Sequence, residues 1–196
     1  AIKNLSRILS IKSFDNNVVA TSELTTRVTE GTTTIYVTVE VSSSILLLPE
    51  VPMTGRLDNP RVGYFTNPLT NFSDGQQRVN KKQFITRWRL EPRPEDRAAY
   101  LRGELVEPRK PIVFYIENST PYRWRKYIKQ GIEDWQVAFE RAGFKNAIIA
   151  KDITEDMEVD MDDVNYSVLT YAASTKANAM GPSILDPRSG EILEAD

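Results

Sequence analysis

The chain has 196 residues, of which 40% are hydrophobic and 27% are charged, and its formal net charge at pH 7 is −2. This length supports one large domain or two small ones, and the small charge gives no reason to expect nucleic acid or an anionic membrane as a partner. The sequence contains no cysteine and no histidine, which excludes disulfides, thiolate metal sites and histidine zinc ligands within these residues. We expect no transmembrane segment, because the longest apolar stretch, Ile45–Leu48, is far too short to span a bilayer.

The first 48 residues are rich in β-branched residues, serine and threonine. Val18–Val28 predicts a strand, and a turn at 29–32 leads into Thr33–Val41, which alternates polar and apolar residues. The apolar residues of this second strand, from Ile35 onward, fall on one face. We therefore expect a hairpin that is half-buried on that face and belongs to a larger sheet.

Residues 49–105 contain six prolines and several glycines and asparagines, which predict an extended, turn-rich connection. Within it, Lys82–Leu90 is typical of a strand, and 95–102 of a short helix. Tyr64 and Phe65 are too apolar for a solvated linker. We expect this connection to pack across a domain surface.

One long amphipathic helix is predicted at 121–142. Thr120 is expected to cap it, and Pro121 to occupy its first helical position. Gly143 is expected to end the helix in a left-handed conformation, with Phe144 folding back on the last turn. The predicted buried stripe consists of Trp124, Ile128, Ile132, Trp135, Phe139 and Ala142. The residues predicted to face solvent are Arg125, Lys126, Lys129, Glu133, Glu140 and Arg141.

Further strands are predicted on both sides of this helix, at Pro111–Asn118, Asn146–Lys151, Tyr166–Ala173, Ala179–Leu185 and Glu191–Asp196. The sequence thus predicts the α+β class. An antiparallel β-rich region occupies residues 1–105, and a mixed sheet with one long helix occupies residues 106–196.

Several stretches of the chain resemble one group of large bacterial zinc-dependent metalloproteases of the metzincin type. The stretches are Asp58–Thr66 (DNPRVGYFT), Arg87–Leu90 (RWRL), Lys110–Ile116 (KPIVFYI), Gly131–Asp152 (GIEDWQVAFERAGFKNAIIAKD), Asn178–Pro182 (NAMGP) and Asp186–Leu193 (DPRSGEIL). The resemblance covers roughly residues 45–196. It implies a β-rich region of unassigned role, followed by the front half of a metzincin-like peptidase domain.

In that family the zinc ligands and the general-base glutamate lie on an HExxHxxGxxH helix that follows these strands. The resemblance therefore implies that the chain is a truncated fragment, inactive alone, of a parent hydrolase that uses zinc to cleave a peptide or protein substrate. The zinc helix would follow Asp196. The resemblance also implies an exported bacterial protein, periplasmic or on the cell surface. Truncation would expose an apolar face, so we expect either a dimer through it or an exposed patch.

The fragment retains one candidate substrate site. In metzincins an edge strand binds the substrate peptide antiparallel to itself, and the resemblance assigns this strand to the segment before Asp186. Unpaired backbone groups would supply the hydrogen bonds. The candidate residues are Met180, Gly181, Pro182, Ser183, Ile184 and Leu185. The alternative is an ordinary surface strand that leads into a hairpin.

An acidic run at 152–163 is the one candidate metal site. Asp156, Glu158 and Asp160 alternate as in a calcium loop, and carboxylates suit Ca²⁺. However, Met161 stands where an EF-hand needs glycine, and Ser167 where it needs a bidentate glutamate. The pattern therefore favours a solvated acidic loop.

Two basic–aromatic clusters, 87–89 and 123–126, could suggest base stacking. We favour packing instead, since Trp88 and Trp124 are expected to point inward, and we predict no nucleic-acid partner. Two functional interpretations remain. The first is part of a zinc peptidase, and the second is a non-catalytic peptide- or protein-binding or scaffold module.

Overall fold

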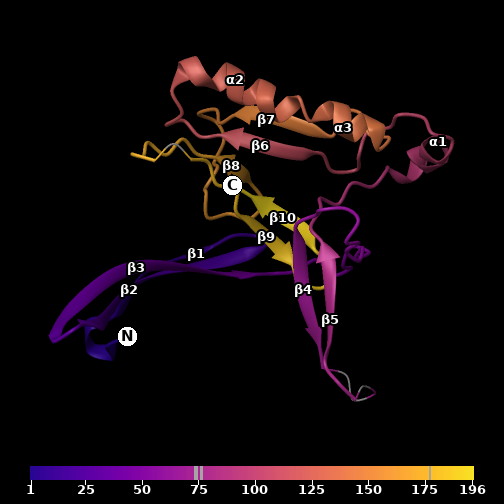
Figure 1. The fold of residues 1–196 in the computed structure, drawn as a ribbon. Coiled ribbons are helices and arrows are strands. Elements are labelled where there is room, and N and C mark those ends of the chain that lie inside the picture. The colour runs from indigo at the N-terminus through magenta and orange to yellow at the C-terminus, as the bar shows by residue number, and fades with distance from the viewer. Residues whose placement is uncertain (73–74, 76, 177) are drawn as a thin grey trace. The chain divides into compact units, whose positions relative to one another are not determined.

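The computed structural model describes residues 1–72, 75, 77–176 and 178–196. The chain forms two compact units (Figure 1). The first contains Ala1–Leu48 with Asp162–Val164, and the second contains Pro49–Met161 with Asn165–Asp196. Antiparallel hairpins precede a helix-bearing sheet along the chain, which confirms the α+β class at this coarse level. The predicted regional boundary at residue 105 does not coincide with the division into units and stays a prediction.

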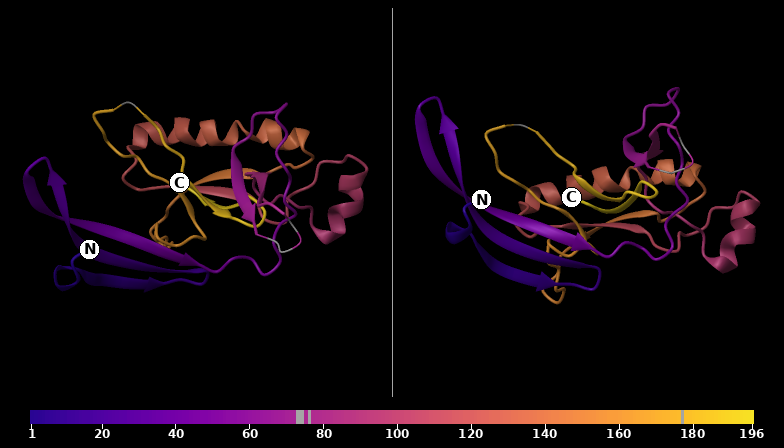
Figure 2. Two further views of the ribbon diagram at one scale, coloured as in Figure 1. Left: turned by 60° about the horizontal axis from the view of Figure 1, so that its bottom comes forward. Right: turned by 90° about the horizontal axis from the view of Figure 1, so that it is seen from below.

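The first unit is built on an antiparallel sheet with the strand order β1-β2-β3. After a short 3-10 turn, η1 (Lys3–Leu5), come β1 (Arg7–Ser13), β2 (Asn17–Glu30) and β3 (Thr33–Leu46). Strands β2 and β3 pair without interruption over their full length and form a long, curved ribbon (Figure 2). Gly31 has a φ of +61° in the tight turn between them, a conformation that glycine adopts without strain. The predicted hairpin is confirmed.

The predicted burial of the hairpin's apolar face is wrong. Ile35 is 53% exposed and Val39 is 45% exposed. The segment at 162–164 lies instead on the opposite, polar face of the sheet. There Asn17 donates a 2.7 Å hydrogen bond to the carbonyl of Asp162 and accepts one from the amide of Val164. The hydrogen bonds of Asn17 and the buried side chain of Val19 therefore both lie on this opposite face.

The second unit contains a parallel sheet with the strand order β7-β6-β8. Its strands are β6 (Ile112–Ile116), β7 (Ile148–Asp152) and β8 (Ser167–Leu169). The helices α2 (Tyr122–Glu133) and α3 (Gln136–Arg141) connect β6 to β7 and run along this sheet (Figures 1 and 2). The predicted strands on both sides of the helical segment are present, although β8 is shorter than the predicted strand at Tyr166–Ala173. The predicted mixed sheet is wrong for the described residues, because β6, β7 and β8 are parallel and the β9–β10 hairpin forms a separate sheet.

The single long helix predicted at 121–142 is instead two helices. Trp135 donates its amide to the carbonyl three residues back, on Ile132, which tightens the chain into a 3-10 turn between α2 and α3. The side-chain oxygen of Gln136 then accepts the amide of Ala147, and its nitrogen donates to the carbonyl of Phe144. Gln136 thereby ties the start of α3 to the chain entering β7.

The start of the helix also differs from the prediction. Pro121 takes the capping position and Tyr122 is the first helical residue. The Thr120 side chain is buried and makes no hydrogen bond within the described part of the chain. Arg125 and Lys129, predicted to face solvent, instead reach the carboxylate of Asp152 at the end of β7.

The C-terminal end of α3 agrees with the prediction. Gly143 has a φ of +92°, and Phe144 is 4% exposed and donates its amide to the carbonyl of Phe139. The predicted terminator and fold-back are therefore confirmed. The Phe144 ring stacks on Tyr100 with centroids 5.0 Å apart. Val106 and Ala147 complete this cluster.

The remaining elements of the second unit are short. They are the hairpin β4 (Thr66–Asn71) with β5 (Asn80–Ile85), the turn η2 (Pro94–Asp96), helix α1 (Arg97–Leu101), and the hairpin β9 (Ser183–Asp186) with β10 (Glu191–Ala195). The predicted short helix near residue 100 is confirmed. Trp88 lies beyond β5 and packs edge-on against Phe114, with the ring centroids 6.1 Å apart. This contact is expected for an inward-pointing ring. Among the helices of the described residues, none is long and apolar enough to cross a membrane.

Candidate functional site

The β9–β10 hairpin carries the predicted peptide-binding strand. Its turn is held by the Asp186 side chain, which is fully buried and accepts three hydrogen bonds from the Arg188 guanidinium, at 3.0, 3.2 and 2.7 Å. The Arg188 contact holds the pKa of Asp186 below its usual value, although burial opposes this effect. Gly190 completes the turn at a φ of +75°, and a Cβ there would lie 2.5 Å from the carbonyl oxygen of Ile85. The ion pair and the close approach at Gly190 therefore both favour this turn conformation.

Strand β10 lies between β9 and the chain segment around Arg87. Arg87 donates its amide to the carbonyl of Gly190, and Ile192 donates its own to Arg87, so β10 is hydrogen-bonded on both edges. The Arg89 guanidinium adds a 2.6 Å ion pair to the Glu191 carboxylate. Among the described residues, β9 pairs only with β10, which leaves its outer edge open.

The predicted candidate residues divide into two groups. Ser183, Ile184 and Leu185 lie on β9, whereas Met180, Gly181 and Pro182 precede it. The strand starts later than predicted because Pro182 has no amide hydrogen, although its carbonyl still accepts the amide of Asp196. Met180 is 82% exposed. The predicted strand at Glu191–Asp196 corresponds closely to β10.

Two carboxylates lie together at the end of β10, a feature that the sequence analysis missed. Glu194 is 6% exposed, and one of its oxygens has no hydrogen-bond partner in the described part of the chain. Burial, assisted by a hydrogen bond to Asp196 and by its charge, raises the pKa of Glu194 to about 8. At neutral pH this carboxyl is mainly protonated and can share a proton with its neighbour. Nothing in the alternation of β10 signals a buried acid.

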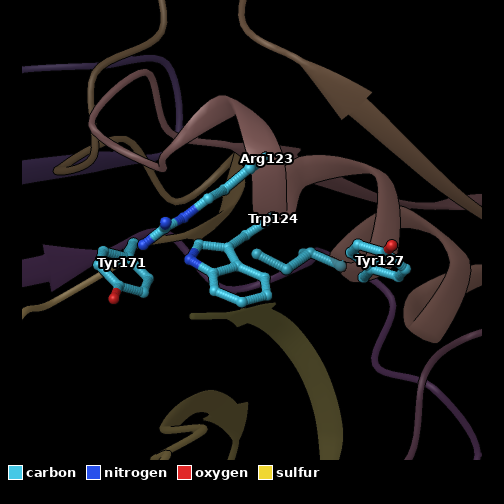
Figure 3. Close-up of a pocket in the computed structure, with 5 residues that line it drawn as sticks. Arg123, Trp124, Tyr127 and Tyr171 are labelled. Carbon is cyan, nitrogen blue, oxygen red and sulfur yellow. The ribbon is translucent and has the colours of Figure 1, made fainter.

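A second feature is an aromatic hollow at the start of α2, with a cavity volume of about 420 Å³ (Figure 3). The Arg123 guanidinium carbon lies 5.0 Å from the centroid of the Trp124 ring and extends toward Tyr171. Among the described residues, Arg123 has no carboxylate partner within salt-bridge distance. Tyr127 and Ile128 complete the lining. A cation beside aromatic rings can hold a planar or anionic group.

The predicted burial of two tryptophans on the helix is wrong. Trp124, expected to begin a buried stripe, is 42% exposed, and Trp135 is 65% exposed. Neither α2 nor α3 has a fully buried residue. Helical spacing correctly placed Ile128, Ile132 and Phe139 on the partly buried side, but spacing alone does not show how much of a stripe is covered.

The calcium candidate gains no support from the geometry. Within the described ranges, no group of three or more acidic side chains is arranged to hold a metal ion, and this includes Asp156, Glu158 and Asp160. A hydrogen bond from Thr154 lowers the pKa of Asp156, which is consistent with an exposed acidic turn.

Fold and site together define an α+β protein with a helix-bearing parallel sheet and a C-terminal hairpin whose outer strand, within the described residues, is unpaired on one edge. Residues 1–93 match the family model described as "Domain of unknown function (DUF5117)". Neither the comparison with curated proteins nor that with solved structures gave a match. The family match spans the Ala1–Leu48 part of the first unit and the start of the second, and it ends before the parallel sheet.

Proposed function

We propose that the chain is the front part of a zinc-dependent metallopeptidase of the metzincin type. The observation that carries this proposal is the order of elements in the second unit. A strand, a helical crossover and two more parallel strands precede a hairpin whose first strand, β9, is an edge. This order agrees with the one that the sequence resemblance implies for the residues before a zinc-binding helix.

The residues of this chain do not fit a catalytic zinc by themselves. A hydrolytic zinc needs about three protein ligands, most often with imidazole among them, and the 196 residues include no histidine and no cysteine. The described residues also contain no acidic cluster that could replace them. In this proposal the zinc ligands and the catalytic base come from residues after Asp196 in a longer protein, and residues 1–196 alone are inactive.

What this chain contributes in the proposal is a strand that positions the substrate. An extended peptide can add to an open sheet edge through backbone hydrogen bonds. The amide of Asp196 donates to the carbonyl of Pro182, and backbone groups alternate along an antiparallel strand. Ile184 therefore faces β10 with its backbone groups, whereas those of Ser183 and Leu185 face outward. A peptide would bind to these outward groups.

The proposal is tested on the chain extended beyond Asp196 through the next helix. We expect about one bound zinc per protein and cleavage of an unstructured peptide. Leu185→Pro should reduce cleavage at least about tenfold, because it removes an outward donor but no bond to β10. Leu185→Ala is the matched control and should keep most of the activity. An extended protein without zinc and without cleavage would contradict the proposal.

A second candidate function is a non-catalytic peptide- or protein-binding or scaffold module. The open edge of β9 favours it, since adding a strand needs no metal. In this case residues 1–196 bind peptide as tightly as the extended protein does, and Leu185→Pro weakens binding in both. Titration of an unstructured peptide, followed by backbone amide shifts of β9, separates this function from catalysis.

A further inference from the structure

One face of the β1-β2-β3 sheet consists mainly of aliphatic side chains. The β2–β3 register pairs Val28 with Ile35 and Val18 with Ile45. Because side chains alternate across a strand, the even-numbered residues of β2 from 18 to 28 share one face with the odd-numbered residues of β3 from 35 to 45. Ile8 and Ile11 of β1 pair with even-numbered residues of β2 and join the same face. We call these residues the aliphatic face.

Most of the aliphatic face is exposed, although Leu24 and Val37 near its middle are half-buried. Ile8 is 63% exposed, Ile11 is 65% exposed and Ile45 is 74% exposed. The segment at 162–164, which belongs to the same unit, lies instead on the opposite face, where Lys12 and Asn17 contact Asp162. A stable domain normally buries the apolar face of a sheet against a second layer. The described residues of this unit provide no such layer.

The chemistry of the aliphatic face suits contact with a copy of itself. Its other members are small or hydroxyl-bearing residues such as Ala20, Ser22, Thr26 and Ser43, and none of its members is charged. The charged side chains of these strands, such as Glu23, Arg27 and Glu40, belong to the opposite face, and Glu30 lies next to the turn. Two such faces can therefore meet without burying an unpaired charge.

The aliphatic face is as large as the largest apolar patches of monomers, and it approaches the area that each partner of a standard interface buries. Strands β2 and β3 have 14 residues each and β1 has 7. At a rise of about 3.4 Å per residue and a strand spacing of about 4.8 Å, the three strands span a flat area on the order of 600 Å². A standard interface buries about 800 Å² per partner, whereas the largest apolar patch of a typical monomer reaches about 300–600 Å².

We propose that the aliphatic face binds the aliphatic face of a second copy of this chain. A twofold axis relates the two sheets, which pack face to face as the two layers of a sandwich. Each sheet supplies the layer that the other lacks. The proposal does not depend on zinc or on peptidase activity.

The first test compares two lysine substitutions at adjacent positions of β3 in the full 196-residue chain. Val39 belongs to the aliphatic face, and Glu40 points to the opposite face. Wild-type protein should sediment at twice the monomer mass of 22.3 kDa. Val39→Lys should raise the dimer dissociation constant at least about tenfold, because it places a charge in an apolar contact on both copies. Glu40→Lys should leave the dissociation constant within about threefold.

A second test uses the absence of cysteine from the chain. Single substitutions Val39→Cys and Glu40→Cys provide the only thiols, whose reaction rates with a soluble thiol reagent can be compared. The proposal predicts that the thiol at position 39 is protected at high protein concentration and reacts freely on dilution, whereas the thiol at position 40 reacts freely at both.

Three results would overturn the proposal. A monomer whose position-39 thiol reacts freely shows that nothing covers the face. A monomer whose position-39 thiol is protected at every concentration shows that other residues of the same chain cover it. A dimer that tolerates Val39→Lys as well as Glu40→Lys forms through another surface. Circular dichroism of each variant confirms that the sheet content is retained.

Discussion

Strand β3 of the first unit alternates polar and aliphatic side chains, and strand β6 of the second unit is apolar throughout. Their isoleucines are buried very differently. Ile116 of β6 is fully buried and Ile112 is 3% exposed, whereas Ile35 of β3 is 53% exposed. Strand β6 has a parallel neighbour on each side and a helical crossover along the sheet. Strand β3 has one neighbour, and the described residues of its unit add no second layer. Alternation in a sequence therefore indicates a strand with two different faces, but the surroundings decide whether the apolar face is buried.

The largest expected effect separates these two strands. Ile116→Ala should lower the free energy of unfolding by about 3 kcal/mol, because it leaves a cavity in a closed core. Ile35→Ala should cost less than about 1 kcal/mol in the monomer, where the side chain is already largely in water. Urea unfolding at several protein concentrations measures both. The cost of Ile35→Ala should grow with concentration if β3 is at a dimer interface, whereas the cost of Ile116→Ala should not.

The next effect compares two glycines with positive φ, one in each unit. A Cβ at Gly143 would lie 2.6 Å from the Tyr100 ring, whereas nothing lies within 4 Å of a Cβ at Gly31. Gly143→Ala should therefore lower the free energy of unfolding by about 2–3 kcal/mol, from backbone strain and a clash together. Gly31→Ala should cost about 1 kcal/mol, from strain alone. Thermal unfolding of the two variants measures the difference, and equal costs would contradict the packing of Tyr100 over Gly143.

A smaller effect tests the ion pair that holds the β9–β10 turn. Arg188→Gln leaves the buried Asp186 carboxylate without its cation and should lower the free energy of unfolding by about 2 kcal/mol. The cost is smaller than for a fully buried pair because Arg188 is partly exposed. The pKa of Asp186 is lowered in the folded chain, so its contribution to stability is present above about pH 4 and is lost as the pH falls below that value. Unfolding measured from about pH 3 to 7 should show a weaker pH dependence in the variant. Arg93→Gln, at an exposed ion pair, is the control and should cost little.

The smallest effect concerns the buried acid of β10. The pKa of Glu194 is raised to about 8 in the folded chain, above the value of 4.5 for a free side chain. The folded state therefore holds an extra proton, and stability falls as the pH rises from about 4.5 to 8. Glu194→Gln should remove this slope and stabilise the chain near pH 8 by about 1–2 kcal/mol. Unfolding at about pH 5 and about pH 8 checks both signs, and a variant with the wild-type slope would show that Glu194 ionises normally.

The local structure of this protein could be predicted largely from its sequence. The β2–β3 hairpin, the helical crossover and the Gly143 terminator follow from alternation, helical spacing and turn chemistry. These signals act over a few residues. The helix break at Trp135 was missed because it depends on Gln136 contacts with Phe144 and Ala147, which lie 8 and 11 residues away.

The candidate site was harder to predict, for the same physical reason. Which edge of a hairpin stays open depends on what pairs with the other strand, and here Arg87 reaches β10 from a segment about 100 residues earlier in the chain. The high pKa of Glu194 and the aromatic hollow at Arg123 likewise depend on contacts that the local pattern does not encode. One signal was available for the hollow, because Arg123 and Trp124 are adjacent in the chain.

The central claim is that the second unit precedes a zinc-binding helix, and the most direct test is to determine the sequence that follows Asp196 in the gene. We expect a helix with an HExxH motif and a third zinc ligand within a few tens of residues. A stop codon, or a following helix without these ligands, would contradict it. The chain would then be a binding or scaffold module that uses the open edge of β9 without catalysis.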